Sequence, residues 1–461
     1  MRPTIVTRLS VRICRAERLS ASSPRRNPLV ALTLLVIALM SIASGAANLE
    51  RDSLDAIARD FVINGLVHFH HDTMTHLYIG EPELKREADS HSDDLTEVLA
   101  KFSVLRQRLE QLPRPSASHE RQRQRDLRDR IIAFETRGNI LLGNYPATFD
   151  EETQQLFGVM APHLPEAHFT ALTEALEELV PGDEPLVQRL ETFRKQFILP
   201  VDKLEAVIGA AMTECRQRTL AHMALPEDER VTLHITHNQP FVGFTYYRGN
   251  SHSEIHLNAD VPVHIERAIE LGCHEGYPGH HVHATLLEQE IIKTRGWLEY
   301  SLVTLFGPLA VIAEGAASHA IDLTFTEAER QQFEREVLLP MAGLSSDHLE
   351  RYYRYVSLVE ELNFARNEAA RKFLYDGLAR EQVIEWLMTY GLETRATASQ
   401  RLDFITAWRS YVVTYNIGRV LVRDAIEESA GDDRNSQWQA FKDILLAPKM
   451  PADLMVTGIE P

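Results

Sequence analysis

The sequence predicts a mainly α-helical fold with one short β-sheet near its middle. Apolar residues recur three and four positions apart through most of the chain, which is typical of helices that bury one face. Residues 231–237 and 253–258 instead alternate polar with apolar or β-branched side chains, as short strands do. With 461 residues, 44% of them hydrophobic, the chain is long enough to bury a large core.

The N-terminal segment, residues 1–47, has the pattern of an export signal. An arginine-rich stretch ends at Arg26, an uncharged apolar run covers 29–43, and small residues follow at 44–47. The run is shorter than the about 20 residues that a membrane-spanning helix needs. We therefore expect a cleaved signal peptide and a periplasmic or extracellular protein. Retention of the segment as an anchor is the alternative, and only then would a membrane be a stable partner.

Residues 48–200 predict an N-terminal helical region, and residues 201–461 a second helical region that contains the sheet. Asp260 and Pro262 resemble the cap and first turn of the helix that follows the strands. Between the strands, 243–250 reads as a turn-rich aromatic stretch. The expected helices of the first region are 54–75, 95–112, 122–136, 166–180 and 185–197. Those after residue 290 are 299–322, 326–338, 346–376, 380–390, 394–427 and 436–446.

The most informative motif is Cys-His-Glu-Gly-Tyr-Pro-Gly-His-His at 273–281. A catalytic zinc ion is held by imidazoles and a carboxylate, and a second carboxylate takes a proton from its water. His274 with His280 or His281 supplies imidazoles, and Glu275 suits the general base. On an ideal helix neither later histidine could share an ion with His274.

A local distortion of the helix would resolve this spacing. Pro278 removes a backbone donor and Gly279 relaxes the chain, so a widened turn could bring His280 onto the face of His274. His280 needs the smaller insertion, and His281 remains the alternative or a supporting residue. Glu314, among apolar neighbours, is the third candidate ligand, because a buried carboxylate needs a partner. A Glu paired with an Arg or Lys is its simpler interpretation.

The eight residues from His274, the Glu-Gly-Ala run at 314–316 and the Tyr-Val-Val-Thr-Tyr-Asn-Ile-Gly run at 411–418 resemble signatures of the bacterial domain-of-unknown-function family 885. The resemblance covers about residues 50–450 as one continuous domain. That family looks like a group of helical, predicted zinc metallopeptidases. The resemblance implies metal ligation by His274, His280 and Glu314, with Glu275 as base. It also implies that Tyr415 is the phenol that stabilises the oxyanion.

Other candidate residues follow less directly. Tyr247, Asn258 and Arg409 are candidates for substrate binding, although hairpin packing and an ion pair explain the first and last equally well. His252, His256 and His283 could line the same site. The histidines at 68, 70, 71 and 76 are a weaker metal candidate, because no catalytic carboxylate accompanies them. Cys273 is expected to be buried rather than disulfide-bonded.

The sequence thus predicts an exported zinc-dependent hydrolase, a metallopeptidase acting on a peptide or a small amide. A hydrolase of some non-peptide amide and a non-catalytic exported binding protein are the alternatives. The formal net charge of −18 argues against nucleic acid as a partner. Bond specificity and oligomeric state are not encoded in any pattern that we recognise.

Overall fold

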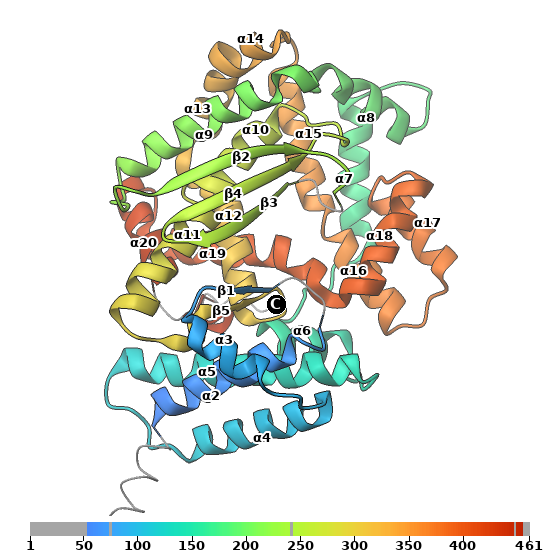
Figure 1. Ribbon diagram of the computed structural model, residues 1–461. Coiled ribbons are helices and arrows are strands. Elements are labelled where there is room, and N and C mark those ends of the chain that lie inside the picture. Colours follow the sequence, from blue (N-terminus) through green and yellow to red (C-terminus); the bar gives the residue numbers. More distant parts are fainter. Residues whose placement is uncertain (1–52, 73–75, 240–242, 447–448, 455–461) are drawn as a thin grey trace, which may run out of the picture. The chain divides into compact units, whose positions relative to one another are not determined.

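The computed structural model describes residues 53–72, 76–239, 243–446 and 449–454 (Figure 1). The expected signal segment 1–47 lies outside the described residues. The chain divides after Arg51, and residues 52–461 form one compact unit. This unit is mostly helical with a few short strands, so the predicted fold class is confirmed. Within the described part, no helix combines the length and apolarity needed to cross a membrane.

The first helices surround their own hydrophobic cluster, which includes Phe61, Phe102 and Phe134. The start of the second long helix in this group is fixed by a capping box between Asp94 and Glu97. A two-stranded ribbon connects the cluster to the rest of the unit, because β1 pairs antiparallel with β5. The elements are α2 (Leu54–His68), β1 (His76–Tyr78), α3 (Pro82–Asp89), α4 (Leu95–Gln111), α5 (Ser118–Leu141) and β5 (Leu302–Thr304).

A larger hydrophobic cluster extends from Ile140 to Leu454 and contains most remaining helices. It spans the expected boundary at residue 200, which stays a prediction. The long helix 204–220 that packs under the sheet was not among the predicted helices. The elements before the sheet are α6 (Phe149–Phe157), α7 (Glu166–Leu179), α8 (Leu186–Arg194), η1 (Lys195–Phe197), η2 (Val201–Lys203) and α9 (Leu204–Leu220).

The sheet has three strands in the order β2-β4-β3 (Figure 1). The predicted strands are present as β2 (Arg230–Thr236) and β4 (His252–Asn258), and they pair in parallel. The aromatic stretch between them is a strand, β3 (Gly243–Gly249), antiparallel to β4. The turn prediction for it was wrong, because its Phe-Thr-Tyr-Tyr core favours a strand and the terminal glycines only bound it. β3 is therefore an edge strand of this sheet.

Helices follow the sheet, with several interruptions. The predicted start at Asp260 was wrong, because its carboxylate accepts a hydrogen bond from the Asn238 amide (2.6 Å) and pairs with His237. The predicted helix 394–427 is broken at Arg409, where φ is 50°. The elements up to Thr324 are α10 (Glu266–Glu270), η3 (Leu271–Gly276), α11 (His280–Leu286), η4 (Leu287–Thr294), η5 (Leu298–Ser301) and α12 (Pro308–Thr324).

The remaining helices complete the larger cluster. The predicted helix 346–376 is two helices, because the chain turns at Asn363 and Phe364. The elements are α13 (Glu327–Phe333), η6 (Glu334–Leu338), α14 (Leu339–Ala342), α15 (Leu349–Leu362), α16 (Ala365–Leu374), α17 (Arg380–Tyr390), α18 (Arg395–Trp408), η7 (Arg409–Val412), α19 (Val413–Ala430), α20 (Arg434–Leu446) and α21 (Pro451–Leu454).

Candidate metal centre

The His-Glu motif lies on a distorted helix. Residues Leu271–Gly276 form a π-helical turn, η3, in place of an α-helical one. The chain then becomes extended at Tyr277 and re-enters a helix at His280. The imidazole rings of His274 and His280 consequently lie edge to face, with their centroids 4.7 Å apart. The widened turn predicted at this place is confirmed, and such turns often occur at functional sites.

Gly279 allows the two halves of the motif to approach so closely. Its amide donates to the carbonyl of Cys273 (2.9 Å). A Cβ atom at Gly279 would lie 1.9 Å from the carbonyl oxygen of His274 and 2.5 Å from that of Cys273. Any other residue would force these backbone segments apart. The geometry of the histidine pair therefore depends on this glycine.

Glu314, on α12, faces both histidines. Its Oε2 lies 3.6 Å from Nε2 of His274, and its Oε1 lies 3.7 Å from Nε2 of His280. The three side chains expose only 15%, 22% and 13% of their surface in the order His274, His280, Glu314. Burial raises the pKa of the Glu314 carboxyl and lowers that of His280. The cluster is thus held in an environment that disfavours unpaired charge.

The donor set of this cluster fits a transition-metal ion. One ligand atom from each of His274, His280 and Glu314 lies within 4.8 Å of the others. Oε2 of Glu314 is buried and has no hydrogen-bond partner among the described residues, although Tyr411 donates to Oε1 at 3.5 Å. A buried carboxylate oxygen without a donor needs a cation. Two imidazoles and one carboxylate are the protein ligands of many catalytic zinc sites.

Glu275 lies beside the cluster and is held by the sheet. Its Oε2 accepts a hydrogen bond from the hydroxyl of Thr245 on β3 (2.6 Å), and its side chain is buried. Burial opposes ionisation of Glu275, but nearby His274 and His280 and the Thr245 hydroxyl outweigh it, so the net effect lowers its pKa. An oriented, ionised carboxylate next to a candidate metal is the arrangement that a general base requires.

Tyr415, on α19, is a further neighbour of the cluster. It packs edge-on against Tyr411, with ring centroids 5.5 Å apart, and 47% of its surface is exposed. Burial of its inner part raises the pKa of Tyr415, and the Glu314 carboxylate adds to the rise. Tyr415 therefore stays a protonated donor at neutral pH. Close packing of α12 on α19 brings it here, since a Cβ at Gly315 would lie 2.2 Å from the Gly418 carbonyl oxygen.

His281 points away from this cluster. Its Nδ1 lies 2.8 Å from the Ser253 hydroxyl, and its Nε2 lies 3.0 Å from Glu229. Glu229 also accepts from Tyr277 and Arg216, and these contacts with His281 overcome burial to hold its pKa at about 2. Both ring nitrogens therefore have protein partners, which favours the supporting role of His281 over that of an alternative ligand. It anchors the motif to the inner face of the sheet.

Each of the three substrate-binding candidates has a partner within the fold. Tyr247 is buried and donates to Glu288. The amide of Asn258 donates to the Gln239 carbonyl (3.0 Å) and shapes the turn after β4. Arg409 binds Oε2 of the buried Glu152 through two nitrogens, at 2.6 and 2.9 Å. These contacts engage each side chain within the fold, and a role in substrate binding stays a prediction.

The other candidate histidines do not belong to this cluster. His283 is buried, and burial lowers its pKa to about 4. His252 and His256 alternate along β4 with Ser253, which contacts His281, so they lie on the opposite, outer face of the sheet. In the earlier histidine group, His68 packs against aromatic rings including Phe134, and His70 pairs with Asp89. Among the described residues that group forms no metal-type cluster.

Sequence reasoning missed Thr245, Tyr411 and Glu229 as contacts of the motif, and it missed a disulfide. Cys215 on α9 is bonded to Cys273, next to His274, so the prediction of an unbonded Cys273 was wrong. The two residues are 58 positions apart, and only the packing of α9 on η3 brings them together. Tyr411 belongs to a signature that the sequence displays, whereas no local pattern marks Thr245.

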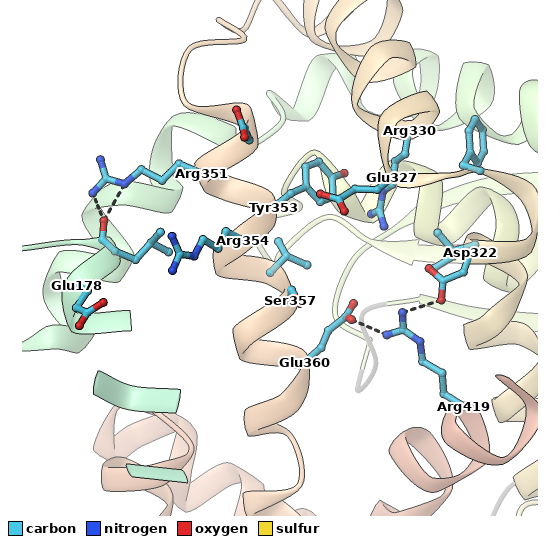
Figure 2. A pocket seen from close by; sticks show the side chains of 15 residues that line it. Glu178, Asp322, Glu327, Arg330, Arg351, Tyr353, Arg354, Ser357, Glu360 and Arg419 are labelled. Atoms are coloured by element: carbon cyan, nitrogen blue, oxygen red, sulfur yellow. Dashed lines mark hydrogen bonds and ion pairs between the residues drawn. The ribbon is translucent and has the colours of Figure 1, made fainter. Parts of the chain in front are cut away.

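One large cavity lies away from this centre. It has a volume of about 880 Å³ and is bordered by α12, α15 and α19 (Figure 2). None of the cluster residues lines it. Its charged groups are largely paired, since Arg419 bridges Asp322 and Glu360 and Arg351 donates to the Leu179 carbonyl. Size alone therefore does not locate the chemistry in this protein.

No protein-family model matches the chain, and no curated protein sequence matches it. Solved structures overlap with it at low similarity. A candidate lipoprotein from Colwellia psychrerythraea is 15% identical, with 80% of this chain and 67% of that chain covered and a TM-score of 0.48. A candidate lipoprotein of unknown function from Shewanella oneidensis is 14% identical (78% and 70% covered, TM-score 0.43).

An M32 carboxypeptidase from Deinococcus radiodurans R1 is 13% identical, with 85% of this chain and 89% of that chain covered and a TM-score of 0.45. Structural similarities this low support no conclusion about activity. The functional assignment therefore rests on the side chains of the candidate centre.

Proposed function

We propose that the protein is an exported zinc-dependent hydrolase, a metallopeptidase of the type implied by its resemblance to family 885. The observation that carries the proposal is the largely buried cluster of His274, His280 and Glu314, in which one carboxylate oxygen makes no hydrogen bond among the described residues. Glu275 stands next to it, fixed by Thr245. Structural zinc sites usually close with four Cys or His ligands, so this open donor set favours catalysis.

In this proposal each side chain has a distinct task. A bound zinc ion supplies an activated water at neutral pH and a positive charge for the developing oxyanion. Glu275 takes the proton of the attacking water and passes it to the leaving amine. Tyr415 donates a hydrogen bond to the oxyanion, for which it must remain protonated. Tyr411 steadies Glu314 by donating to its Oε1.

The position of β3 favours a peptide as substrate. β3 is paired on one side only, with β4, and its Thr245 touches Glu275. An extended peptide that added to this edge as a further strand would pass beside the general base. A small amide hydrolysed by the same residues, and a binding protein without activity, are the other outcomes of the experiment below.

Export is supported by two independent features. The first 47 residues have the composition of a signal segment. The Cys215–Cys273 disulfide belongs to the oxidising conditions found outside the cytosol. We therefore propose a periplasmic or extracellular location.

The experiment compares the purified full chain with Glu275→Gln in metal content and in cleavage of a mixed peptide library. Both proteins should bind zinc at the candidate centre, and the variant should cleave about 10²- to 10⁴-fold more slowly. Glu290→Gln, at an exposed glutamate on η4, is the matched control and should behave as wild type. If the wild type binds zinc but cleaves no peptide, the peptidase assignment fails. If His274→Ala leaves zinc content unchanged, the metal centre fails.

A further inference from the structure

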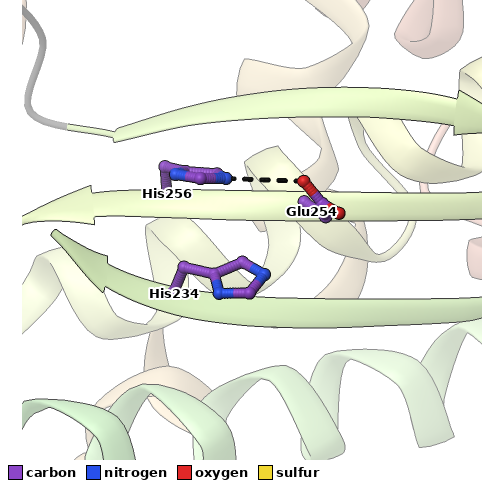
Figure 3. A group of neighbouring side chains, drawn as sticks. All are labelled: His234, Glu254 and His256. Atoms are coloured by element: carbon purple, nitrogen blue, oxygen red, sulfur yellow. Dashed lines mark ion pairs between the residues drawn. The ribbon is translucent and has the colours of Figure 1, made fainter.

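A second group of metal-type ligands lies on the sheet, outside the candidate centre. His234 on β2 and Glu254 and His256 on β4 project from the same face (Figure 3). His234 is the register partner of His256 in the parallel pair, and Glu254 precedes His256 by two residues. Side chains two apart on a strand share a face, so register alone brings the three together.

This face is opposite to the one that touches the His-Glu motif. On the inner face of the sheet, Thr245 of β3 contacts Glu275, and Ser253 of β4 contacts His281. Glu254 and His256 alternate with Ser253 along β4. Glu254 and His256 therefore point outward, with 27% and 24% of their side chains exposed. None of the three residues belongs to the His-Glu motif or to the runs at 314–316 and 411–418.

The distances in the group are close to those of a metal site. The three ligand atoms lie within 4.8 Å of one another, and Nε2 of His256 is 3.6 Å from Oε2 of Glu254. The rings of His234 and His256 have centroids 4.9 Å apart. Ligand atoms around tetrahedral zinc are about 3.3 Å apart, given bonds of about 2.0–2.1 Å. Small side-chain rotations would close this difference, because the backbone positions are already in register.

One atom in the group lacks a hydrogen bond. Nε2 of His256 is buried and makes no hydrogen bond among the described residues, although it lies 3.6 Å from Oε2 of Glu254. Buried ring nitrogens normally bond to a protein group or to water. The Arg248 guanidinium, by contrast, donates twice to Oε2 of Glu254, at 2.6 and 2.9 Å. It is the cation that now neutralises this carboxylate, and it would compete with a metal ion.

We infer that His234, Glu254 and His256 bind a divalent transition-metal ion, such as zinc, as a second site independent of the candidate centre. Two imidazoles and a carboxylate favour Zn²⁺, Cu²⁺, Ni²⁺ or Co²⁺ over Ca²⁺ and Mg²⁺, which prefer oxygen ligands. The partial exposure of the ligands leaves room for water or a further donor in the coordination sphere. The bound ion therefore exchanges with ions in the solvent.

The test is a zinc titration of the metal-free full chain against a chromophoric chelator. Wild type should bind two ions of different affinity, and His234→Ala/His256→Ala should lose the weaker one. Arg248→Ala should bind that ion about two- to fivefold more tightly, because a competing surface ion pair has been removed. His237→Ala, at an exposed histidine just after β2, is the matched control and should bind as wild type. Far-UV circular dichroism checks that each variant is folded.

The outcomes separate this site from the proposed function. Loss of the tighter ion in His274→Ala, with both sheet variants binding as wild type, overturns the second site and leaves the candidate centre intact. Loss of the weaker ion in the double variant supports the sheet site whatever happens at His274. Equal weakening by His237→Ala means adventitious binding by surface histidines and overturns the inference.

Discussion

In the part of the chain that the structure describes, two imidazoles and a carboxylate come together twice, once on helices and once on a sheet. The helical cluster of His274, His280 and Glu314 requires a π-helical turn and a glycine without which the backbone would clash. The sheet cluster of His234, Glu254 and His256 requires only the register of two strands. The same donor set can thus arise from a costly local distortion or from regular geometry.

The surroundings of the two clusters differ more than their ligands. The helical cluster has Glu275 and Tyr415 beside it, a candidate base and a hydrogen-bond donor. The sheet cluster exposes slightly more of its side chains and has the Arg248 cation bound to its carboxylate. Preorganised groups beside a metal favour catalysis, whereas a competing cation favours reversible binding. We expect the clusters to respond differently to the same perturbations.

The largest expected difference is in hydrolysis. His274→Ala should lower kcat/KM on a peptide substrate by at least about 10³-fold, because the water-activating ion is lost. His237→Ala should remain within about twofold of wild type. The measurement is steady-state hydrolysis after zinc reconstitution. Activity that survives in His274→Ala would move the chemistry away from the helical cluster.

A backbone substitution should affect the helical cluster alone. Gly279→Ala places a Cβ against the His274 carbonyl and should cost about 3 kcal/mol or more of unfolding free energy, with loss of the tighter zinc ion. Gly209→Ala, in α9 with open space around it, is the control and should stabilise by up to about 1 kcal/mol. Urea unfolding and zinc content give both results. Wild-type zinc binding by Gly279→Ala would show that the close approach is dispensable.

Breaking the disulfide should produce a smaller difference in zinc binding between the two clusters. Cys215→Ser frees η3 from α9 and should lower the unfolding free energy by about 2–4 kcal/mol, as expected for a crosslink that closes a long loop. It should also weaken zinc binding at the helical cluster and not at the sheet. Reductant should destabilise wild type and leave the variant unchanged. Equal stability of the two proteins without reductant would contradict the crosslink.

The smallest expected effect concerns pH. Burial and the neighbouring Arg194 lower the pKa of His264, which precedes α10, to about 3. The folded state therefore keeps His264 neutral, and the unfolded state binds a proton below its ordinary pKa of about 6.5. The contribution of neutral His264 to the free energy of unfolding should be fully present above that pH. It should fall as the pH drops towards 3, by about 2 kcal/mol between pH 6.5 and 5. Urea unfolding of His264→Asn should show a shallower dependence, and an identical slope would refute this.

Parts of the candidate centre were predictable because they are local in sequence. His274, Glu275 and His280 lie within seven residues, and Pro278 and Gly279 mark the place where the helix must widen. Glu314 was recognisable because a carboxylate in an apolar helix needs a partner. Whether these residues bind zinc stays a prediction. The proximity of His274 to His280 follows from rules that act over one or two helical turns, whereas Glu314 is brought to them by the packing of α12.

Contacts between distant segments could not be predicted in the same way. Neither Thr245 beside Glu275 nor the Cys215–Cys273 disulfide has a local signal. The orientation of His281 depends on Glu229, 52 positions earlier, and the sheet cluster depends on the register of β2 and β4. Even β3 was missed, because its aromatic residues are decisive only once a neighbouring strand is present.

The sequence by itself determined the helical fold class, the position of the short sheet and the identity of the motif residues. These features follow from the periodicity of apolar residues and from residues close together in the chain, whose arrangement is constrained mainly by backbone geometry. The tertiary structure alone decided how His281 is oriented, which side chains contact Glu275, and that a second cluster forms on the sheet. Those outcomes depend on packing and register between segments far apart in the chain, and no local propensity encodes them.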